Sequence, residues 1–423
     1  MNHDDDDTNK VIYIPHQSNA DARLTTDRAA TKSPFRLLLV DIAILFKNLR
    51  YLPWVLTPIR SPDSIPGVPP TSKWHKIRDY TLVSIISLVE VIIIPLSFLV
   101  FLALPGLVFC LYIALVCLLV YLFEHTMWGP LVLHSTVPLP TSPAFVAERW
   151  LYINGIGTSS RGLQLTLNRL AGRFKRPVVG VHNRSAGIPM DVLECILQRC
   201  LGYSTTDVRT AHEYLKLQLC NDAVRKVVVV AHSQGGIITA LALDRLFVEL
   251  AAHEIAKLEV YTFGSAASHF NDPHLSVERG AEVDGVMAMR RVPGVRTIEH
   301  YMNEFDLVPR WGVKYSTSES PNQRYAGRVF INRNATGHLF DEHYLDIMFP
   351  LREDGELEAG GFLDDIVEIE ERPSRVPTPE GDLERYVEDG GIRWVMSADD
   401  APNGGRSVRE LSKLWRYVNG GTT

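Results

Sequence analysis

Cysteine is scarce in this chain, and neither sign of charge is in large excess. Five of the 423 residues are cysteine, no C-x-x-C pair occurs, and the formal net charge is −6. A small, odd number of cysteines gives no disulfide framework, and scattered histidines give no metal-ligand pattern, so we expect neither a metal nor another cofactor. Because no basic cluster interleaves with aromatic residues, no nucleic-acid partner is expected.

The first part of the chain lacks a long apolar run. Residues 1–34 open with the acidic stretch MNHDDDDTNK, and no apolar core follows a basic start. We therefore predict a disordered tail over 1–34 and no signal peptide. Residues 35–80 mix leucines with basic and aromatic residues, which predicts an interfacial or linker segment. It either lies flat on lipid headgroups or packs against a globular domain.

Charge is almost absent from residues 81–123. Glu90 is the one formal charge there, and the stretch is about twice as long as the roughly 20 apolar residues that cross a bilayer. The length favours two helices over one long or re-entrant segment. The predicted transmembrane hairpin covers 81–124, with helices over about 81–104 and 106–123 and a reversal at Pro105 and Gly106.

Positive charge is distributed unevenly around this hairpin. Lysine and arginine precede it, and none follows until Arg149. The positive-inside rule then places the N-terminal flank in the cytosol. Two spans return the rest of the chain to the cytosol, whereas one span would leave it in the lumen. We expect Glu90 to face the partner helix or the backbone loosened by Pro95, with a functional group at mid-membrane as the alternative.

The chain does contain a buried strand that ends in a polar, glycine-lined corner. Four valines from Val227 indicate a strand of a parallel sheet covered on both faces, and apolar residues from Ile237 recur at helical spacing. Between them, AHSQGG places Ser233 among small neighbours, as in the nucleophile elbow G-x-S-x-G, with alanine at the first small position. Ser233 is therefore the candidate nucleophile, and a structural glycine turn is the alternative.

An acid and a base follow Ser233 in the order that a Ser-Asp-His triad on this kind of sheet needs. One later strand ends in a turn that carries Asp306, the candidate acid, and the final strand leads to a turn that carries His338, the candidate base. His343 is the alternative base, and it falls on a first helical turn if Asp341 is the N-cap. We favour His338 because it lies directly beyond the strand.

The oxyanion of the reaction needs backbone donors. One should be the amide of Gln234, which follows the nucleophile, and another should come from a loop after an earlier strand. The segment 154–157, NGIG, is a glycine turn between a strand and a helix, and we choose the amide of Ile156. A simple turn is the alternative for this segment.

Three stretches resemble the α/β-hydrolase superfamily, and within it the class 3 lipases. They are AHSQGG at 231–236, YTFGSAA at 261–267 and NEFDLVP at 303–309. The resemblance covers about residues 148–350 and implies a serine hydrolase that uses the three candidate residues and forms an acyl-enzyme. The stretches INGIGTSSRG and GHLFDEHYLDIMFP are also similar to uncharacterised fungal lipase-like membrane proteins.

The predicted fold class is α/β, with a doubly wound α/β-hydrolase sheet over residues 145–350, preceded by the transmembrane hairpin. Residues 268–294 form the longest insertion on the active-site side of the sheet, either a lid or substrate wall or a solvated loop. Residues 351–423 are predicted to be an acidic, loop-rich extension that ends in a short helix, VRELSKLWRYVNG.

Together these features predict an integral membrane protein that is a serine ester hydrolase, lipase-like or esterase-like. Its expected partners are the bilayer and a lipid or other ester substrate, because a tether raises the local concentration of membrane-bound molecules. A non-catalytic membrane scaffold on a hydrolase fold and an acyltransferase with the same triad are the alternatives. The chain length and headgroup of the substrate, the organelle and the oligomeric state leave no mark in the sequence.

Overall fold

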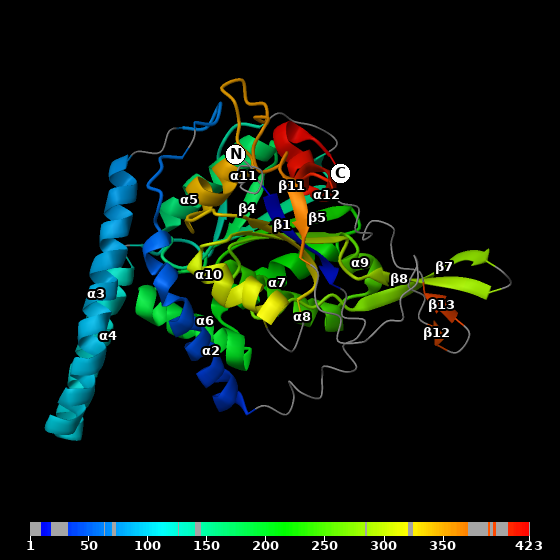
Figure 1. The fold of residues 1–423 in the computed structure, drawn as a ribbon. Helices are drawn as coiled ribbons and strands as arrows, with labels where there is room; N and C mark the ends of the chain where they lie inside the picture. Colours follow the sequence, from blue (N-terminus) through cyan, green and yellow to red (C-terminus); the bar gives the residue numbers. More distant parts are fainter. Residues whose placement is uncertain are drawn as a thin grey trace, which may run out of the picture.

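A nine-stranded mixed sheet forms the centre of the molecule (Figure 1). The computed structural model describes residues 10–17, 33–62, 64–69, 73–125, 127–139, 145–283, 286–319, 325–370, 388–389, 392–394 and 405–422. Within these residues the strands follow one another across the sheet as β11 (Ile366–Ile369), β1 (Lys10–Gln17), β10 (Gly327–Asn332), β9 (Thr297–Asn303), β6 (Leu258–Phe263), β5 (Lys226–His232), β3 (Glu148–Ile153), β4 (Val178–Val181) and β2 (Val132–His134).

The central strands of this sheet are parallel. β10, β9, β6, β5, β3 and β4 all run the same way, whereas β1 pairs antiparallel with β10 and β2 pairs antiparallel with β4. The carboxyl ends of the six parallel strands therefore meet at one edge of the sheet, where ligand sites of open α/β sheets lie. We call this edge the carboxyl edge and the opposite one the amino edge.

Helices cover both faces of the sheet. Along β5, Val227 and Val229 belong to one hydrophobic cluster and Val228 and Val230 to the other, because successive strand residues point to opposite faces. One face packs against α6 (Ile188–Leu201), α7 (Thr206–Leu219) and α8 (Gln234–Glu249), and the other against α5 (Ser160–Phe174), the π-helix η5 (Phe340–Leu345), α11 (Asp346–Met348), α12 (Val408–Leu411) and the 3-10 helix η7 (Leu414–Gly420). The predicted α/β class and doubly wound sheet are confirmed.

Short elements complete this domain, which we call the sheet domain. A small helix α9 (Ala252–Ile255) precedes β6, and α10 (Leu307–Pro309) and the π-helix η4 (Arg310–Glu319) follow β9.

The N-terminal segment differs from the predicted disordered tail. Residues 10–17 form β1, which inserts between β10 and β11, and its Val11, Tyr13 and Ile14 side chains are buried. The apolar stretch VIYI is short and follows an acidic run, so its partner strands, distant in sequence, give it structure that its local composition does not indicate. The rest of the predicted tail, 1–9 and 18–32, lies outside the described residues.

The C-terminal extension also contributes to the sheet domain. Its first strand, β11, extends the sheet beyond β1. The predicted terminal helix is interrupted at Ser412, whose backbone is extended with φ −83° and ψ 151°, so it divides into α12 and η7. Val408, Leu414 and Tyr417 are buried, which explains why this segment folds back onto the core.

The insertion over 268–294 is not a lid over the site. It contains the hairpin β7 (His274–Val283) and β8 (Val286–Pro293), which pairs with β13 (Ile392–Trp394) and β12 (Glu388–Asp389) in a second sheet. The amide of Val295 donates to Asp272 at 2.9 Å, and the amide of Arg296 donates to Leu258 O at 3.0 Å. The insertion therefore leaves from the amino edge, and it projects away from the α-helical hairpin (Figure 1).

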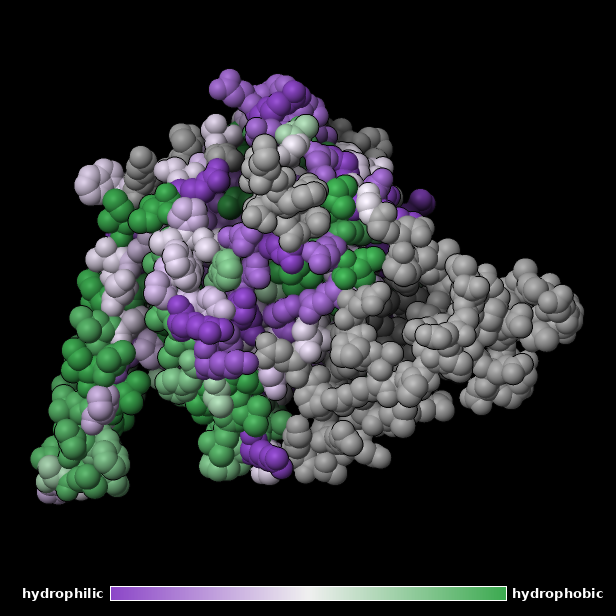
Figure 2. Space-filling view, in the orientation of Figure 1, coloured by the Kyte–Doolittle hydropathy of each residue, from purple (hydrophilic) through white to green (hydrophobic). Residues whose placement is uncertain are grey.

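Two long apolar helices form an antiparallel hairpin beside the sheet domain. They are α3 (Lys73–Ala103) and α4 (Gly106–Glu124), with the reversal at the predicted place. Most large apolar side chains of both helices are exposed, so the hairpin is a hydrophobic projection (Figure 2). One segment, Lys76–Ala103, is long and apolar enough to cross a membrane, and the apolar segment Gly106–Leu122 is shorter.

Glu90 of α3 faces neither the partner helix nor the backbone near Pro95. It is 4% exposed and lies against Gly187 of the sheet domain, where a side chain on the glycine would collide with the carboxylate. The prediction was wrong because the first half of α3 packs against the sheet domain, a long-range contact that the apolar composition of the helix does not reveal.

The predicted linker over 35–80 packs against the sheet domain. Its first part is α2 (Pro34–Asn48), followed by the 3-10 helix η2 (Leu49–Trp54). Asp41 of α2 accepts hydrogen bonds from Arg199 Nη2 at 2.6 Å and from Trp311 Nε1 at 3.1 Å. A buried ion pair thus joins this helix to α6, and a hydrogen bond joins it to η4.

Candidate active site

Ser233 occupies the corner between β5 and α8. Its φ of 56° and ψ of −121° are a strained backbone conformation for a residue with a side chain, as expected of a nucleophile elbow. The corner is possible because its neighbours are small: a side chain at Gly235 would collide with Ile153 O, and one at Gly236 with Ser265. The elbow is also held by the amides of Gly236 and Ala266, which both donate to Ser233 O, at 3.0 and 3.1 Å.

Asp306 and His338 form a buried pair at the same carboxyl edge. His338 Nδ1 lies 2.6 Å from Asp306 Oδ2. Because a carboxylate only accepts, Nδ1 carries the proton in this bond and Nε2 is left as an acceptor. Nε2 is buried without a hydrogen-bond partner among the described residues. This is the protonation pattern of a histidine ready to take a proton.

The carboxylate of Asp306 is fixed by two further donors. Tyr344 Oη donates to Oδ2 at 2.6 Å, and the amide of Val308 donates to Oδ1 at 3.0 Å. Asp306 is fully buried, and donors to a buried carboxylate hold both its charge and its orientation. Tyr344 was not predicted, because only the turn of the π-helix η5 brings it to Asp306.

His232 connects the nucleophile corner to the base. Its ring lies 4.6 Å from the ring of His338 between centroids, and its Nε2 donates to His338 O at 2.8 Å. Burial lowers the pKa of His232 well below its ordinary value, and the nearby His338 lowers it further. His338 thus lies beside the residue that precedes Ser233, although no hydrogen bond joins Ser233 Oγ to His338 Nε2 in the described residues.

His343 is engaged elsewhere through both ring nitrogens. Nδ1 accepts from the amide of Leu339 at 3.0 Å, and Nε2 donates to Pro58 O at 2.8 Å. Burial lowers its pKa, so the ring is neutral. Its helix begins at Phe340, so Asp341 lies inside the first turn and is not the N-cap. With no free nitrogen, His343 lacks the geometry of a base.

The turn that carries His338 is held by a distant segment, residues 54–58, which we call the strap. The amides of Gly337 and His338 donate to Trp54 O and Val55 O at 3.0 and 2.8 Å, and Thr336 Oγ1 donates to Thr57 O at 2.9 Å. The strap lies between η2 and α3 in the chain, so the position of the base depends on the segment that leads to the apolar hairpin. Backbone acceptors leave no sequence signal.

The two segments that carry the predicted oxyanion donors both lie next to Ser233. Gln234 is the first residue of α8, and the N-terminus of a helix favours negative charge. On the other side the turn 154–157 touches Ser233 so closely that a side chain at Gly155 would collide with it. The turn is fixed by Asn154, whose Nδ2 donates to Gly155 O at 2.8 Å and to Asn183 O at 2.9 Å.

A buried polar network extends from Gln234 away from the corner. Its side-chain Oε1 accepts from Asn183 Nδ2 at 2.6 Å, and its Nε2 donates to Glu194 Oε1 at 2.9 Å. Burial raises the pKa of Glu194 to about 7, with Asp207 adding to the shift. Asn183 and Glu194 also line a cavity of about 310 Å³ together with Trp128, Tyr203 and Arg209.

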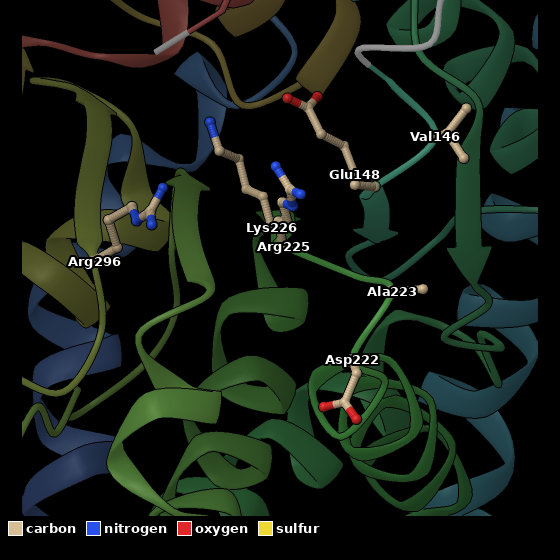
Figure 3. A pocket seen from close by; sticks show the side chains of 8 residues that line it. Val146, Glu148, Asp222, Ala223, Arg225, Lys226 and Arg296 are labelled. Atoms are coloured by element: carbon tan, nitrogen blue, oxygen red, sulfur yellow. The ribbon is translucent and has the colours of Figure 1, made fainter.

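A larger pocket, about 640 Å³, lies at the amino edge. Its lining includes Glu148, Arg225, Lys226 and Arg296 (Figure 3). Glu148 and Lys226 are the first residues of β3 and β5, so the whole length of the sheet separates this pocket from Ser233. It is therefore not part of the candidate active site.

The comparisons with known proteins add two solved structures. No family model and no curated protein matches the sequence. The chain is similar to Est1E from Butyrivibrio proteoclasticus, with a TM-score of 0.26 and 14% identity over 47% of this chain and 83% of that one. It is also similar to XC6422 from Xanthomonas campestris, described as an α/β serine hydrolase without lid, with a TM-score of 0.25 and 13% identity over 49% of this chain and 81% of that one.

Proposed function

We propose that the chain is a membrane-anchored serine ester hydrolase of the α/β-hydrolase type. Ser233 is the nucleophile, His338 the base and Asp306 the acid, and the amides of Gln234 and Ile156 bind the oxyanion. The observation that carries the proposal is the 2.6 Å bond from His338 Nδ1 to Asp306, with Nε2 left free, at the same edge of the sheet as a serine in the strained elbow conformation.

The reaction follows from these positions. Ser233 Oγ attacks the ester carbonyl carbon while His338 Nε2 takes its proton, and the new imidazolium is stabilised by Asp306. The negative carbonyl oxygen binds to the two amides. The C–O bond to the alcohol breaks as His338 returns the proton to the leaving oxygen. Water then attacks the acyl carbon of the acyl-enzyme while His338 takes its proton. The bond to Ser233 Oγ breaks as His338 returns the proton to that oxygen, which releases the carboxylic acid and free Ser233.

The position of the apolar hairpin supports a lipid ester as the substrate. Asp79 of α3 accepts a hydrogen bond from Ser159, and a side chain at Gly157 would be in contact with Val83. The turn 154–157 thus lies directly against α3. If the hairpin enters a bilayer, an ester that leaves the bilayer along α3 reaches the oxyanion donors without crossing water. The excess of basic residues before the hairpin supports a cytosolic sheet domain.

A test of this proposal compares esters presented in two ways. The full-length protein in phospholipid vesicles should hydrolyse both a water-soluble nitrophenyl ester and a vesicle-borne acylglycerol, and Ser233→Ala should lose roughly 10³-fold or more of each rate. A wild-type rate on both esters no higher than that of Ser233→Ala would favour the non-catalytic scaffold. Transfer of the acyl group to an added alcohol in preference to water would favour the acyltransferase.

A further inference from the structure

The helix α2 has an unusual distribution of polar and apolar side chains. Its buried residues are polar, Asp41 and Asn48, and Asp41 binds Arg199 of α6. Leu38, Ile42 and Leu45 are partly buried against the core beside them. Its outward side includes large apolar side chains, and Phe35 and Phe46 are each 67% exposed. A helix on a water-soluble domain keeps its apolar residues inward and exposes polar ones, whereas α2 carries large apolar side chains on its inner and its outer side. The outer surface of α2 is therefore suited to an apolar environment.

The neighbouring helix α6 continues this surface. Met190, Leu193 and Leu201 are 41%, 45% and 57% exposed, and their spacing puts them on one side of the helix. Together with Phe35, Leu39, Val40 and Phe46 of α2 they form what we call the α2–α6 face. Exposed apolar side chains that gather on one surface in this number mark an interaction surface.

The α2–α6 face adjoins the apolar hairpin. The amide of Ile188, the first residue of α6, donates to Ser87 Oγ of α3 at 2.9 Å. In Figure 2 the hairpin and the lower ends of α2 and α6 form hydrophobic surfaces that point the same way. From Ser87 to the end of α3 at Ala103 the helix rises about 24 Å, less than the roughly 30 Å of a hydrocarbon core. A hairpin that enters a bilayer therefore brings the start of α6 to its surface or into it.

Basic residues flank the same face. Arg36, Lys47 and Arg50 are exposed along α2 and η2. Cationic side chains beside an apolar helical surface suit the interface between acyl chains and anionic headgroups.

We propose that the α2–α6 face is a lipid-binding surface that seats the sheet domain on the leaflet entered by the hairpin. This inference rests on the membrane anchorage in the proposed function and is independent of catalysis. It orients the carboxyl edge, and with it Ser233, toward the bilayer. Only the short helix η2 separates α2 from the strap in the chain, so the element that holds His338 also lies near this surface.

Depth-dependent quenching tests the proposal on the full-length protein in vesicles of phosphatidylcholine and phosphatidylserine. An environment-sensitive fluorescent amino acid is placed at Leu39, at Leu193, or at Val248 as the matched control. Val248 is 87% exposed and lies near the end of α8, far from the carboxyl edge. Leu99 in the hairpin reports on anchorage itself. Lipids with brominated acyl chains should quench positions 39, 193 and 99 and leave position 248 unchanged.

Two results would overturn the inference in different ways. Quenching at position 99 without quenching at 39 and 193 would reject the lipid-binding face and leave the anchored hydrolase standing. If that pattern came with a blue-shifted emission at 39 and 193 that is lost on dilution of the protein, a second copy of the chain covers the face. No quenching at position 99 would reject the membrane anchorage together with this inference, whatever the rate of ester hydrolysis.

Discussion

At the residue scale, the two histidines of the final turn have opposite roles in the structure. His338 presents a free Nε2, whereas both nitrogens of His343 are bonded. We expect His338→Ala to lower the acylation rate roughly 10³-fold or more. His343→Ala should change the rate far less and lower the free energy of unfolding by about 1–3 kcal/mol, because it removes two buried hydrogen bonds. Stopped-flow acylation and urea unfolding measure the two effects, and the reverse ranking of rates would reject His338 as the base.

Gly155 allows the turn 154–157 to lie against Ser233. A side chain there would collide with Ser233. Gly155→Ala should therefore reduce the rate of ester hydrolysis at least tenfold, roughly 1.4 kcal/mol in the barrier, because the oxyanion turn must move away from the nucleophile. Gly361→Ala is the matched control, since a side chain there meets only Pro350 at 3.8 Å. Equal rates for the two variants would show that the turn 154–157 does not form the oxyanion site.

Part of the candidate site could be predicted from the sequence. Ser233, Asp306 and His338 each follow a strand in a glycine-rich or polar turn, and the chain order of such turns on a parallel sheet brings them to one edge. Tyr344, His232 and the strap could not be predicted in the same way. Their contacts depend on a π-helical turn, on the direction of one ring and on backbone carbonyls from a segment far away in sequence.

At the element scale, β1 tests whether the N-terminal segment is part of the sheet domain. Ile14 is 1% exposed on this inner strand. Ile14→Ala should lower the free energy of unfolding by about 2–5 kcal/mol. The fully exposed Ile59, at 93% exposure, is the matched control, and Ile59→Ala should change it by less than about 0.5 kcal/mol. Chemical unfolding monitored by tryptophan fluorescence measures the free energy of unfolding of both variants. Equal losses for Ile14→Ala and Ile59→Ala would place β1 outside the folded core.

Some elements are specified by their own local sequence, and others depend on partners that are distant in sequence. The valine strand β5, the helix after it and the apolar hairpin carry strong local patterns, and they form near the predicted positions, although the first helix of the hairpin begins at Lys73 and not near residue 81. β1, β11 and the β7–β8 hairpin depend on partners that lie far away along the chain. A short apolar run beside acidic residues, or an alternating run inside a long insertion, indicates a strand only when the partner is known.

At the scale of the whole molecule, stability should depend on pH through buried carboxyl groups. Burial raises the pKa of Asp272 from 3.8 to about 7, and it raises the pKa of Asp191 to about 6. Such groups bind protons more readily in the folded state, so their stabilising contribution is full below the unfolded pKa of about 4 and is lost as the pH rises to about 7. The contribution of these two groups to the free energy of unfolding should therefore fall from pH 5 to pH 8.

Asp272→Asn isolates one of these groups. Its carboxylate accepts from the amide of Val295 at 2.9 Å, and its other oxygen has no partner among the described residues. The amide is nearly isosteric and cannot ionise, so the variant should show a shallower fall in unfolding free energy between pH 5 and pH 8. Ester hydrolysis should be unchanged, because Asp272 lies at the amino edge. A slope equal to that of the wild type would mean that Asp272 ionises in the folded protein as readily as in water.

The arrangement of the whole molecule places reactive groups, apolar hairpin and strap at one edge of the sheet. The measurement that tests its chemistry most directly is covalent labelling of the full-length protein by a fluorophosphonate, with the modified peptide located by mass spectrometry. We predict one adduct, on Ser233, that is absent in Ser233→Ala and forms far more slowly in His338→Ala. A wild-type protein that stays unlabelled while a known serine esterase reacts under the same conditions, or an adduct on another serine, would contradict this account.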